Sequence, residues 1–148
     1  MEAPMALTLG HVALSVSDLD RSIAFYGGLL GFSVVRIVDC PPEGKLGEVM
    51  NLPGACARLA HLALGDAVLE LLEYAHPRGA AIPPECTLAA LGFTHICLAS
   101  TDIMSDYSRL KSSGVRFYTE PIEYRPGVWM AYFYGPDGET CELRQETA

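Results

Sequence analysis

The sequence predicts an α+β fold of two βαβββ modules that form a curved mixed and antiparallel sheet. Two repeated motifs carry this prediction. HVALSVSDLDRSIAFY begins at His11, and HICLASTDIMSDYSRL begins at His95, 84 residues later. Similarly, LELLEY and CELRQE place Glu70 and Glu142 72 residues apart. Each half thus has the same start and end motif, and each module needs a second module, from this chain or another copy, to cover its sheet.

The first half begins with a strand and a helix. Residues 10–16 alternate in side-chain type and are rich in valine, which is typical of a strand. Ser17 or Asp18 is an N-cap candidate, and apolar residues then recur at helical spacing until the glycines at 27, 28 and 31. We expect further strands at 33–38, 57–65 and 67–74, with Gly65-Asp66 as the turn of the last hairpin.

The second half repeats this order. We expect a strand at 94–100, a helix from Thr101 or Asp102 to about Ser112, and a strand at 115–120. Two final strands, 129–135 and 139–145, flank the turn Pro136-Asp137-Gly138. Residues 1–148 are therefore predicted to form a single domain, with module one at about 8–75, a linker at about 76–92 and module two at about 93–146.

Composition limits the partners that this chain could bind. Half of its 148 residues are hydrophobic and 19% are charged, which suits a globular domain rather than a disordered chain. The net charge of −8, with only ten Lys and Arg, argues against nucleic acid and anionic membranes. Five cysteines without CxxC spacing indicate reduced thiols in a cytoplasmic protein. We expect a cytoplasmic protein whose partner is a small molecule.

Four residues at matching strand positions are candidate metal ligands. Period-two alternation places His11 and His95 on strand faces that carry only small side chains, which leaves room for an ion. Glu70 and Glu142 lie within apolar strands, where a carboxylate is costly unless it is paired or coordinated. A lone strand histidine is usually a hydrogen-bonded core residue, but one His and one Glu per repeat would meet under pseudo-two-fold symmetry. The repeat therefore predicts a site of two His and two Glu.

Three neighbouring polar residues are expected to lie outside this site. His61 has no counterpart in the second half and is expected to pack in the core or at a sheet edge. His76 precedes a proline and is expected in a loop. Glu73 falls on the opposite strand face from Glu70.

The same motifs resemble a known superfamily. HVALSVSDLDRSIAFY followed by LLGF resembles its opening signature, VLELLE its fourth strand, THICL the start of its second module, and FYGPDGETCEL its closing strand pair. The resemblance is to the glyoxalase/bleomycin resistance protein/extradiol dioxygenase (vicinal oxygen chelate) superfamily and covers nearly the whole chain. It implies one ligand at each of His11, Glu70, His95 and Glu142.

The resemblance also implies a chemistry. A divalent ion, Ni, Co, Mn or Zn, would chelate two substrate oxygens and stabilise an enediolate or enolate in a lyase or isomerase of the glyoxalase I or epimerase type. A metal-bound glutamate of that branch moves a proton beside a carbonyl, with Glu142 the first candidate for this base and Glu70 the second. By analogy with the superfamily we expect a homodimer, whose modules pair within one chain or between two.

Two other classes of the superfamily remain as alternatives. An extradiol ring-cleaving dioxygenase would hold Fe(II) with His11, His95 and Glu142, but Glu70 would occupy a position that substrate and oxygen need. A drug-binding resistance protein of the bleomycin type needs no metal, yet two close buried carboxylates without a cation would be destabilising. Four ligands therefore favour the lyase or isomerase.

The substrate is not predicted by the metal ligands. Glyoxalase I has Glu at position 70 but carries Arg where Ser15 stands and Asn where Tyr74 stands, and both help to hold glutathione. Methylmalonyl-CoA epimerase usually has Gln at position 70. The candidate substrate contacts, of which the first and last could bind an anion near the metal, are Arg58, Arg125, Trp129, Tyr132 and Arg144.

Overall fold

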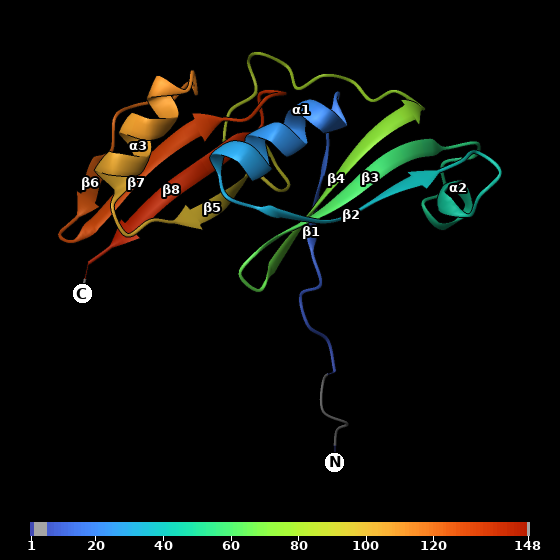
Figure 1. The fold of residues 1–148 in the computed structure, drawn as a ribbon, viewed down its shortest axis with the longest axis horizontal. Coiled ribbons are helices and arrows are strands. Elements are labelled where there is room, and N and C mark those ends of the chain that lie inside the picture. The colour runs from blue at the N-terminus through green and yellow to red at the C-terminus, as the bar shows by residue number, and fades with distance from the viewer. Residues whose placement is uncertain (2–5, 148) are drawn as a thin grey trace. The chain divides into compact units, whose positions relative to one another are not determined.

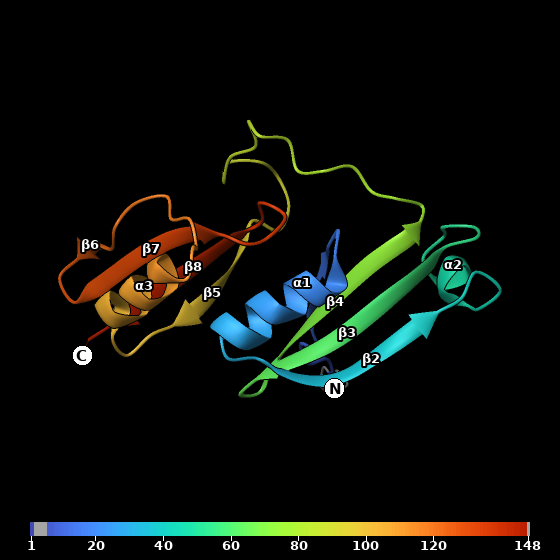
Figure 2. The same ribbon diagram turned by 45° about the horizontal axis from the view of Figure 1, so that its top comes forward.

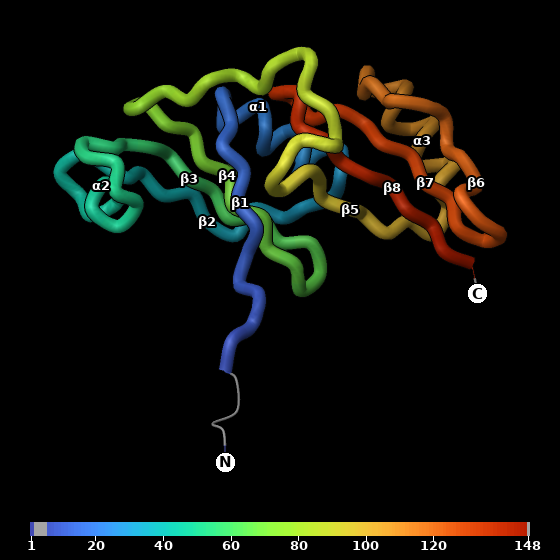
Figure 3. The backbone as a smooth tube through the Cα atoms, turned by 180° about the vertical axis from the view of Figure 1, so that it is seen from behind, coloured from blue at the N-terminus to red at the C-terminus, as the bar shows by residue number. Residues whose placement is uncertain are grey.

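The computed structural model describes Met1 and residues 6–147. The chain divides into two compact units, Met1–Gly79 and Ala80–Ala148, and the division falls inside the predicted linker. Residues 77–94 form turns and bends without a helix or strand (Figure 3). The predicted α+β fold of two βαβββ modules is confirmed, because each unit is a four-stranded mixed sheet with a helix.

The first unit builds its sheet from strands in the order β1-β4-β3-β2 (Figure 1). Its elements are β1 (Val12–Ser15), α1 (Leu19–Ile23), the π-helical segment η1 (Ala24–Leu29), β2 (Ser33–Cys40), α2 (Leu46–Val49), β3 (Cys56–Leu64) and β4 (Ala67–His76). Strand β1 runs parallel to β4, and the other pairs are antiparallel. The helix α1 packs on β3 and β4, which leaves the opposite face of this sheet uncovered by α1 (Figure 2).

The second unit repeats this topology with the order β5-β8-β7-β6. Its elements are β5 (His95–Ala99), α3 (Ile103–Ser112), β6 (Ile122–Arg125), β7 (Val128–Tyr134) and β8 (Thr140–Glu146). Again the first and last strands, β5 and β8, are parallel, and α3 packs on β7 and β8. The sequence repeat therefore corresponds to a repeated βαβββ unit.

One predicted strand is displaced. Residues 115–120 make only an isolated bridge, Phe117 to Phe133, whereas the regular edge strand is β6. The backbone N–H of Tyr118 donates to Tyr132 O at 2.8 Å, so the segment does start to pair with β7. Pro121 then follows, and it has no N–H to continue a ladder. The prediction of a continuous strand at 115–120 was therefore wrong.

The helices α1 and α3, which follow the first strand of each unit, begin as the sequence predicts. The Asp18 carboxylate accepts from Arg21 N at 2.9 Å, and that of Asp102 accepts from Ser105 N at 3.1 Å. An aspartate N-cap satisfies one of the free amides of a first helical turn. In both units three residues, of which the last is the capping aspartate, separate the end of the first strand from the start of the helix.

A second contact ties each helix to its last strand. Leu19 N donates to the Glu73 carboxylate at 2.5 Å, and Ile103 N donates to Gln145 Oε1 at 2.6 Å. These acceptors lie three residues beyond Glu70 and Glu142, on the sheet face that carries the helix. Glu73 thus anchors α1, in agreement with its predicted position on the strand face opposite Glu70.

Replacing Glu73 should test this anchoring. Glu73→Leu leaves Leu19 N without its acceptor, which should lower the free energy of unfolding by about 1–3 kcal/mol. Glu73→Gln should be nearly neutral, because the second unit already uses a glutamine at this position. The midpoints of urea-induced unfolding measure both changes, and a Gln variant as unstable as the Leu variant would contradict the anchoring role.

The cores lie between each helix and its sheet. Fully buried apolar side chains of the two units include Leu19, Tyr26, Leu62, Leu71, Leu110, Phe133 and Cys141. All five cysteines are free thiols. Among the described residues, none of the helices combines the length and apolar character needed to cross a bilayer.

Candidate metal centre

Each unit places one histidine beside one glutamate on the sheet face opposite its helix. In the first unit His11 precedes β1 and Glu70 lies on β4. In the second unit His95 begins β5 and Glu142 lies on β8. The parallel pairing of the first and last strands brings each pair together. The four predicted ligands therefore form two His–Glu pairs, one in each unit, which we call the half-sites.

The first half-site contains a third residue. His11 Nε2 lies 3.7 Å from Glu70 Oε1, and the rings of His11 and His61 are 5.5 Å apart between centroids. His61 Nε2 makes a hydrogen bond with Glu70 Oε2. One potential ligand atom from each of the three residues lies within 4.8 Å of the others. The sequence predicts that His61 packs in the core or at a sheet edge. It lies instead on the interior strand β3, where it contacts the carboxylate of the candidate site.

The hairpin between β3 and β4 explains the position of His61. Gly65 and Asp66 form its turn, and His61 and Glu70 each lie four residues from that turn. They are accordingly direct cross-strand partners, so their side chains project from the same face. The predicted turn already places His61 opposite Glu70, so the pair could have been predicted from the sequence. His61 was left out because it has no counterpart in the second half.

His61 is held in turn by β2. Arg36 pairs with His61 across the β2–β3 ladder, and Arg36 Nε donates to His61 Nδ1 at 2.8 Å. The side chains of His61 and Glu70 are only 14% and 12% exposed. A row of three polar side chains thus crosses three neighbouring strands of the first sheet.

The second half-site is more buried. His95 Nε2 lies 3.0 Å from Glu142 Oε2, and only 5% of the Glu142 side chain is exposed. Tyr132 is the cross-strand partner of Glu142, and its ring meets the His95 ring edge-on at 5.2 Å. Within the part of the chain that the structure describes, Glu142 Oε1 is buried and has no hydrogen-bond partner.

Two neighbours of Glu142 have raised pKa values. Burial, followed by the charge of Glu142, raises the pKa of the Cys97 thiol to about 11. The same two causes, in the same order, raise the pKa of Tyr132. Both groups therefore stay protonated at neutral pH beside Glu142, and Cys97 does not offer a thiolate as a ligand.

The donor set fits a divalent cation. A buried carboxylate oxygen without a partner is costly, and a bound cation would satisfy it. Imidazole and carboxylate together suit Zn, Mn, Co or Ni. His11 lies beside Glu70 and His95 lies beside Glu142. At least a quarter of each histidine side chain is exposed, so an ion could reach either half-site from solvent.

The five candidate substrate contacts divide between the two sheet faces. Tyr132 and Arg144 lie on the face of Glu142, and Arg144 donates from Nε to Glu146 at 2.8 Å. Arg125 on β6 is the cross-strand partner of Val128, which also pairs with Glu146. Tyr132 and Arg144 therefore lie on the sheet face of Glu142, and Arg125 lies in the cross-strand row that contains Glu146.

The other two candidates lie on the helix faces. Arg58 is the partner of Glu73 and lies 3.5 Å from Asp20 of α1 and 3.7 Å from Asp39, as measured between its guanidinium and their carboxylates. Trp129 is the partner of Gln145, which anchors α3. Neither residue lies on the sheet face of the candidate ligands in its own unit.

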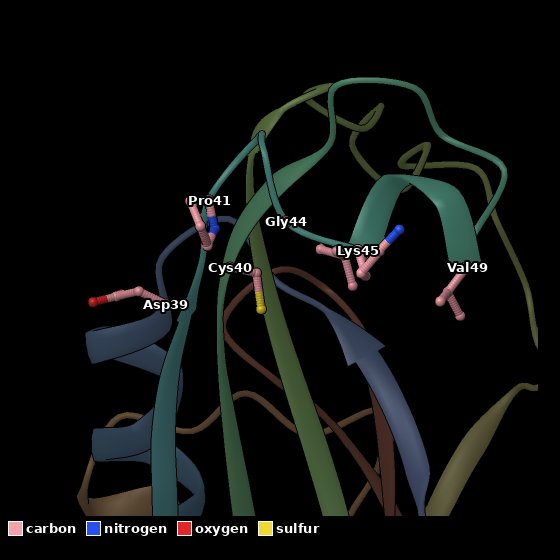
Figure 4. Close-up of a pocket in the computed structure, with 7 residues that line it drawn as sticks. Asp39, Cys40, Pro41, Gly44, Lys45 and Val49 are labelled. Atoms are coloured by element: carbon pink, nitrogen blue, oxygen red, sulfur yellow. The ribbon is translucent and has the colours of Figure 1, made fainter.

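A surface hollow of about 340 Å³ lies elsewhere in the first unit. Figure 4 shows its lining from the end of β2 (Asp39, Cys40 and Pro41) and from around α2 (Lys45 and Val49). None of the three residues clustered around Glu70 lines it. This hollow is therefore distinct from the half-site.

Comparison with known proteins gives a consistent result. The chain is 33% identical over 109 residues to the ethylmalonyl-CoA/methylmalonyl-CoA epimerase of Cereibacter sphaeroides, covering 73% of this chain and 72% of that protein. It is 29% identical over 140 residues to a probable lactoylglutathione lyase of Synechocystis, covering 93% and 95%. A crystal structure of a glyoxalase family protein from Bacillus cereus superposes with a TM-score of 0.88 at 23% identity, covering 100% and 99%.

The family model agrees with the two modules. The model of the Glyoxalase/Bleomycin resistance protein/Dioxygenase superfamily matches residues 8–143. This range begins just before His11 and ends just after Glu142, so it contains all four candidate ligands. The chain therefore belongs to the Glyoxalase/Bleomycin resistance protein/Dioxygenase superfamily.

Proposed function

We propose that this protein is a divalent-metal-dependent lyase or isomerase that moves a proton on a carbon next to a carbonyl group of a small molecule. The observation that carries the proposal is the buried Glu142, which has one oxygen without a hydrogen-bond partner among the described residues and a histidine at the other. Such a carboxylate has a ligand position to fill and a basic oxygen to use.

Four residues would hold the ion. His11 and Glu70 would supply two of the ligands, and His95 and Glu142 would supply the other two. Two neutral imidazoles and two carboxylates balance the charge of a divalent cation, here Ni, Co, Mn or Zn. When bound, the ion acts as a Lewis acid that stabilises negative charge on neighbouring substrate oxygens. By analogy with the superfamily, two copies of the chain would form a homodimer.

The two carboxylates have different surroundings, which suits different roles. Glu70 Oε2 accepts the hydrogen bond of His61, whereas Glu142 Oε1 has no partner in the described structure. Glu142 is therefore the first candidate for the base that removes the substrate proton. Glu70 is the second candidate for the same step.

Arg144 is the candidate for holding an anionic part of the substrate. It lies two residues from Glu142 on the same strand face, and its guanidinium already binds Glu146. A guanidinium in this position could hold a substrate carboxylate or phosphate near the reacting carbon. Tyr132, which stays protonated, could donate a hydrogen bond from its hydroxyl.

The substrate class is an acyl thioester or a thiohemiacetal. The epimerase and the lyase among the relatives are both named for acyl thioesters. We favour the acyl-CoA thioester, because the glutathione-holding residues of glyoxalase I are replaced here by Ser15 and Tyr74. The Tyr74 hydroxyl donates to Met50 Sδ at 3.1 Å, so it is already engaged within its own unit.

Metal content and proton exchange test the proposal together. Protein purified without a metal-affinity tag should contain about one equivalent of Ni, Co, Mn or Zn by elemental analysis. In deuterium oxide the protein should exchange, for deuterium, the proton on the carbon between the two carbonyl groups of methylmalonyl-CoA. Removal of the metal should abolish that exchange. Stoichiometric iron lost in air would instead indicate a ring-cleaving dioxygenase. No metal before or after reconstitution would indicate a binding protein.

A further inference from the structure

We propose that Arg36 and His61 are positioning residues that fix the Glu70 carboxylate as a metal ligand, with His61 donating to Glu70 and binding no metal itself. This inference rests on the proposed metal site. His61 has no counterpart in the second half of the sequence repeat, and it would act on the metal only through Glu70.

The first step is the alignment of the side chains across the sheet. Cross-strand pairing joins Arg36 of β2 to His61 of β3, and His61 to Glu70 of β4. All three side chains project from the same sheet face, and a hydrogen bond connects each neighbouring pair. The row ends at Ala13 of β1, which is the partner of Glu70 and lies two residues after His11. A backbone ladder therefore holds the whole row in register.

The second step is the position of the His61 proton. A guanidinium has only N–H groups, so Arg36 must donate, and His61 Nδ1 must offer a lone pair. The proton of the neutral ring is consequently on Nε2, the atom that faces Glu70 Oε2. Arg36 thus donates to His61, and His61 donates to the Glu70 carboxylate, which brings partial positive charge to that carboxylate.

The third step is that His61 holds Glu70 and does not bind the metal itself. His61 Nε2 lies close enough to His11 and Glu70 to join a three-residue metal cluster. A ligating histidine, however, binds metal through a bare nitrogen and donates from its other nitrogen to an acceptor. Here the other nitrogen receives a hydrogen bond from Arg36, so ligation through Nε2 would require an imidazole without any proton. His61 is thus built as a donor to a ligand.

The fourth step is the contrast with the second unit. The residue paired with Glu142 in register is Tyr132, which occupies the place that His61 has beside Glu70. The described residues give no hydrogen bond to Glu142 Oε1, whereas Glu70 Oε2 is held by His61. The first unit therefore keeps its carboxylate in one orientation, and the second unit leaves one carboxylate oxygen available.

Histidine tautomers provide a test that needs neither metal nor activity. Two-bond ¹H–¹⁵N correlation spectra of the full-length, metal-free protein should show His61 as a single tautomer with the proton on Nε2. The chain has only four histidines, so loss of one signal set in His61→Gln assigns it. Arg36→Gln should release the tautomer preference, while Arg78→Gln, the same charge change at an exposed residue after β4, should not. A proton on Nδ1 in the wild type would overturn the proposal.

Addition of Zn²⁺ distinguishes a positioning residue from a ligand. The His61 Nε2 proton should persist at saturating Zn²⁺. One ring nitrogen of His11 should change its ¹⁵N chemical shift to that of a metal-bound nitrogen. Loss of the His61 Nε2 proton on metal binding would overturn the proposal in favour of direct ligation. Failure of every histidine to respond would reject the proposed metal site, while the metal-free spectrum would still decide the Arg36–His61–Glu70 arrangement.

Metal affinity gives the second readout. His61→Leu removes the donor and should weaken Zn²⁺ binding by about 10–100-fold, the usual effect of losing a partner of a metal ligand. His61→Gln should recover most of that loss, because an amide N–H can replace the Nε2 donor. Competition with a chromophoric chelator measures both constants. Equal affinity in wild type and His61→Leu would overturn the proposal, and the Arg36→Gln spectrum keeps it testable if the Leu variant does not fold.

Discussion

Glu142→Gln should lower the rate of substrate proton exchange by about 10²–10⁴-fold at saturating metal, because a glutamine cannot accept the proton that a general base removes. The amide keeps the shape of the side chain and one oxygen that could still bind the ion. The loss should therefore appear in the exchange rate measured at a metal concentration that saturates the variant. Solvent deuterium incorporation into methylmalonyl-CoA, followed by mass spectrometry, gives the rate directly.

A matched change elsewhere controls for charge. Glu85→Gln removes the same negative charge from an exposed position in the same unit and should leave the rate unchanged. Glu70→Gln separates the roles of the two carboxylates, since it should weaken metal binding more than it slows exchange at saturating metal. If Glu70→Gln abolished exchange while Glu142→Gln did not, the base would be Glu70 and the assignment made here would be reversed.

Chelation should lower the melting temperature of the wild-type protein by about 5–10 °C. An ion bound only to the folded state at a hundred times its dissociation constant stabilises that state by about 2.7 kcal/mol. One kcal/mol corresponds to about 2–4 °C for a chain of this size. Differential scanning calorimetry with and without EDTA, at one protein concentration, measures the shift.

The ligand variants should lose this dependence on chelator. His95→Ala removes the nitrogen that lies 3.0 Å from Glu142, so its melting curve should be nearly the same with and without EDTA. His76→Ala is the matched control, because His76 is exposed at the end of β4, and it should retain the wild-type shift. A wild-type curve that EDTA leaves unchanged would count against the metal centre in both units.

Much of the fold could be predicted because its signals are local. Asp18 and Asp102 cap helices as predicted, since an N-cap depends on residues within one turn. The Gly65-Asp66 hairpin was also predictable, because a two-residue turn sets the register of both its strands. The strand at 115–120 was not, because its pairing depends on where β7 lies and on the break that Pro121 makes.

The candidate metal ligands were predicted from a different kind of signal. His11, Glu70, His95 and Glu142 recur at matching strand positions, and side-chain alternation then assigns their face. The structure places each His beside its own Glu within a unit. That all four bind one ion is still a prediction, which the metal and exchange experiments address.

The amino-acid sequence by itself determined the repeated βαβββ units, the helix starts and the His–Glu pair of each half, because capping, turns and period-two alternation act over a few residues. Only the tertiary structure decided that Arg36 contacts His61 and His61 contacts Glu70, and that Arg58 and Trp129 face the helices. Those contacts join residues on different strands, and their geometry depends on the register of the sheet. A one-residue change in register would turn every such side chain to the other face.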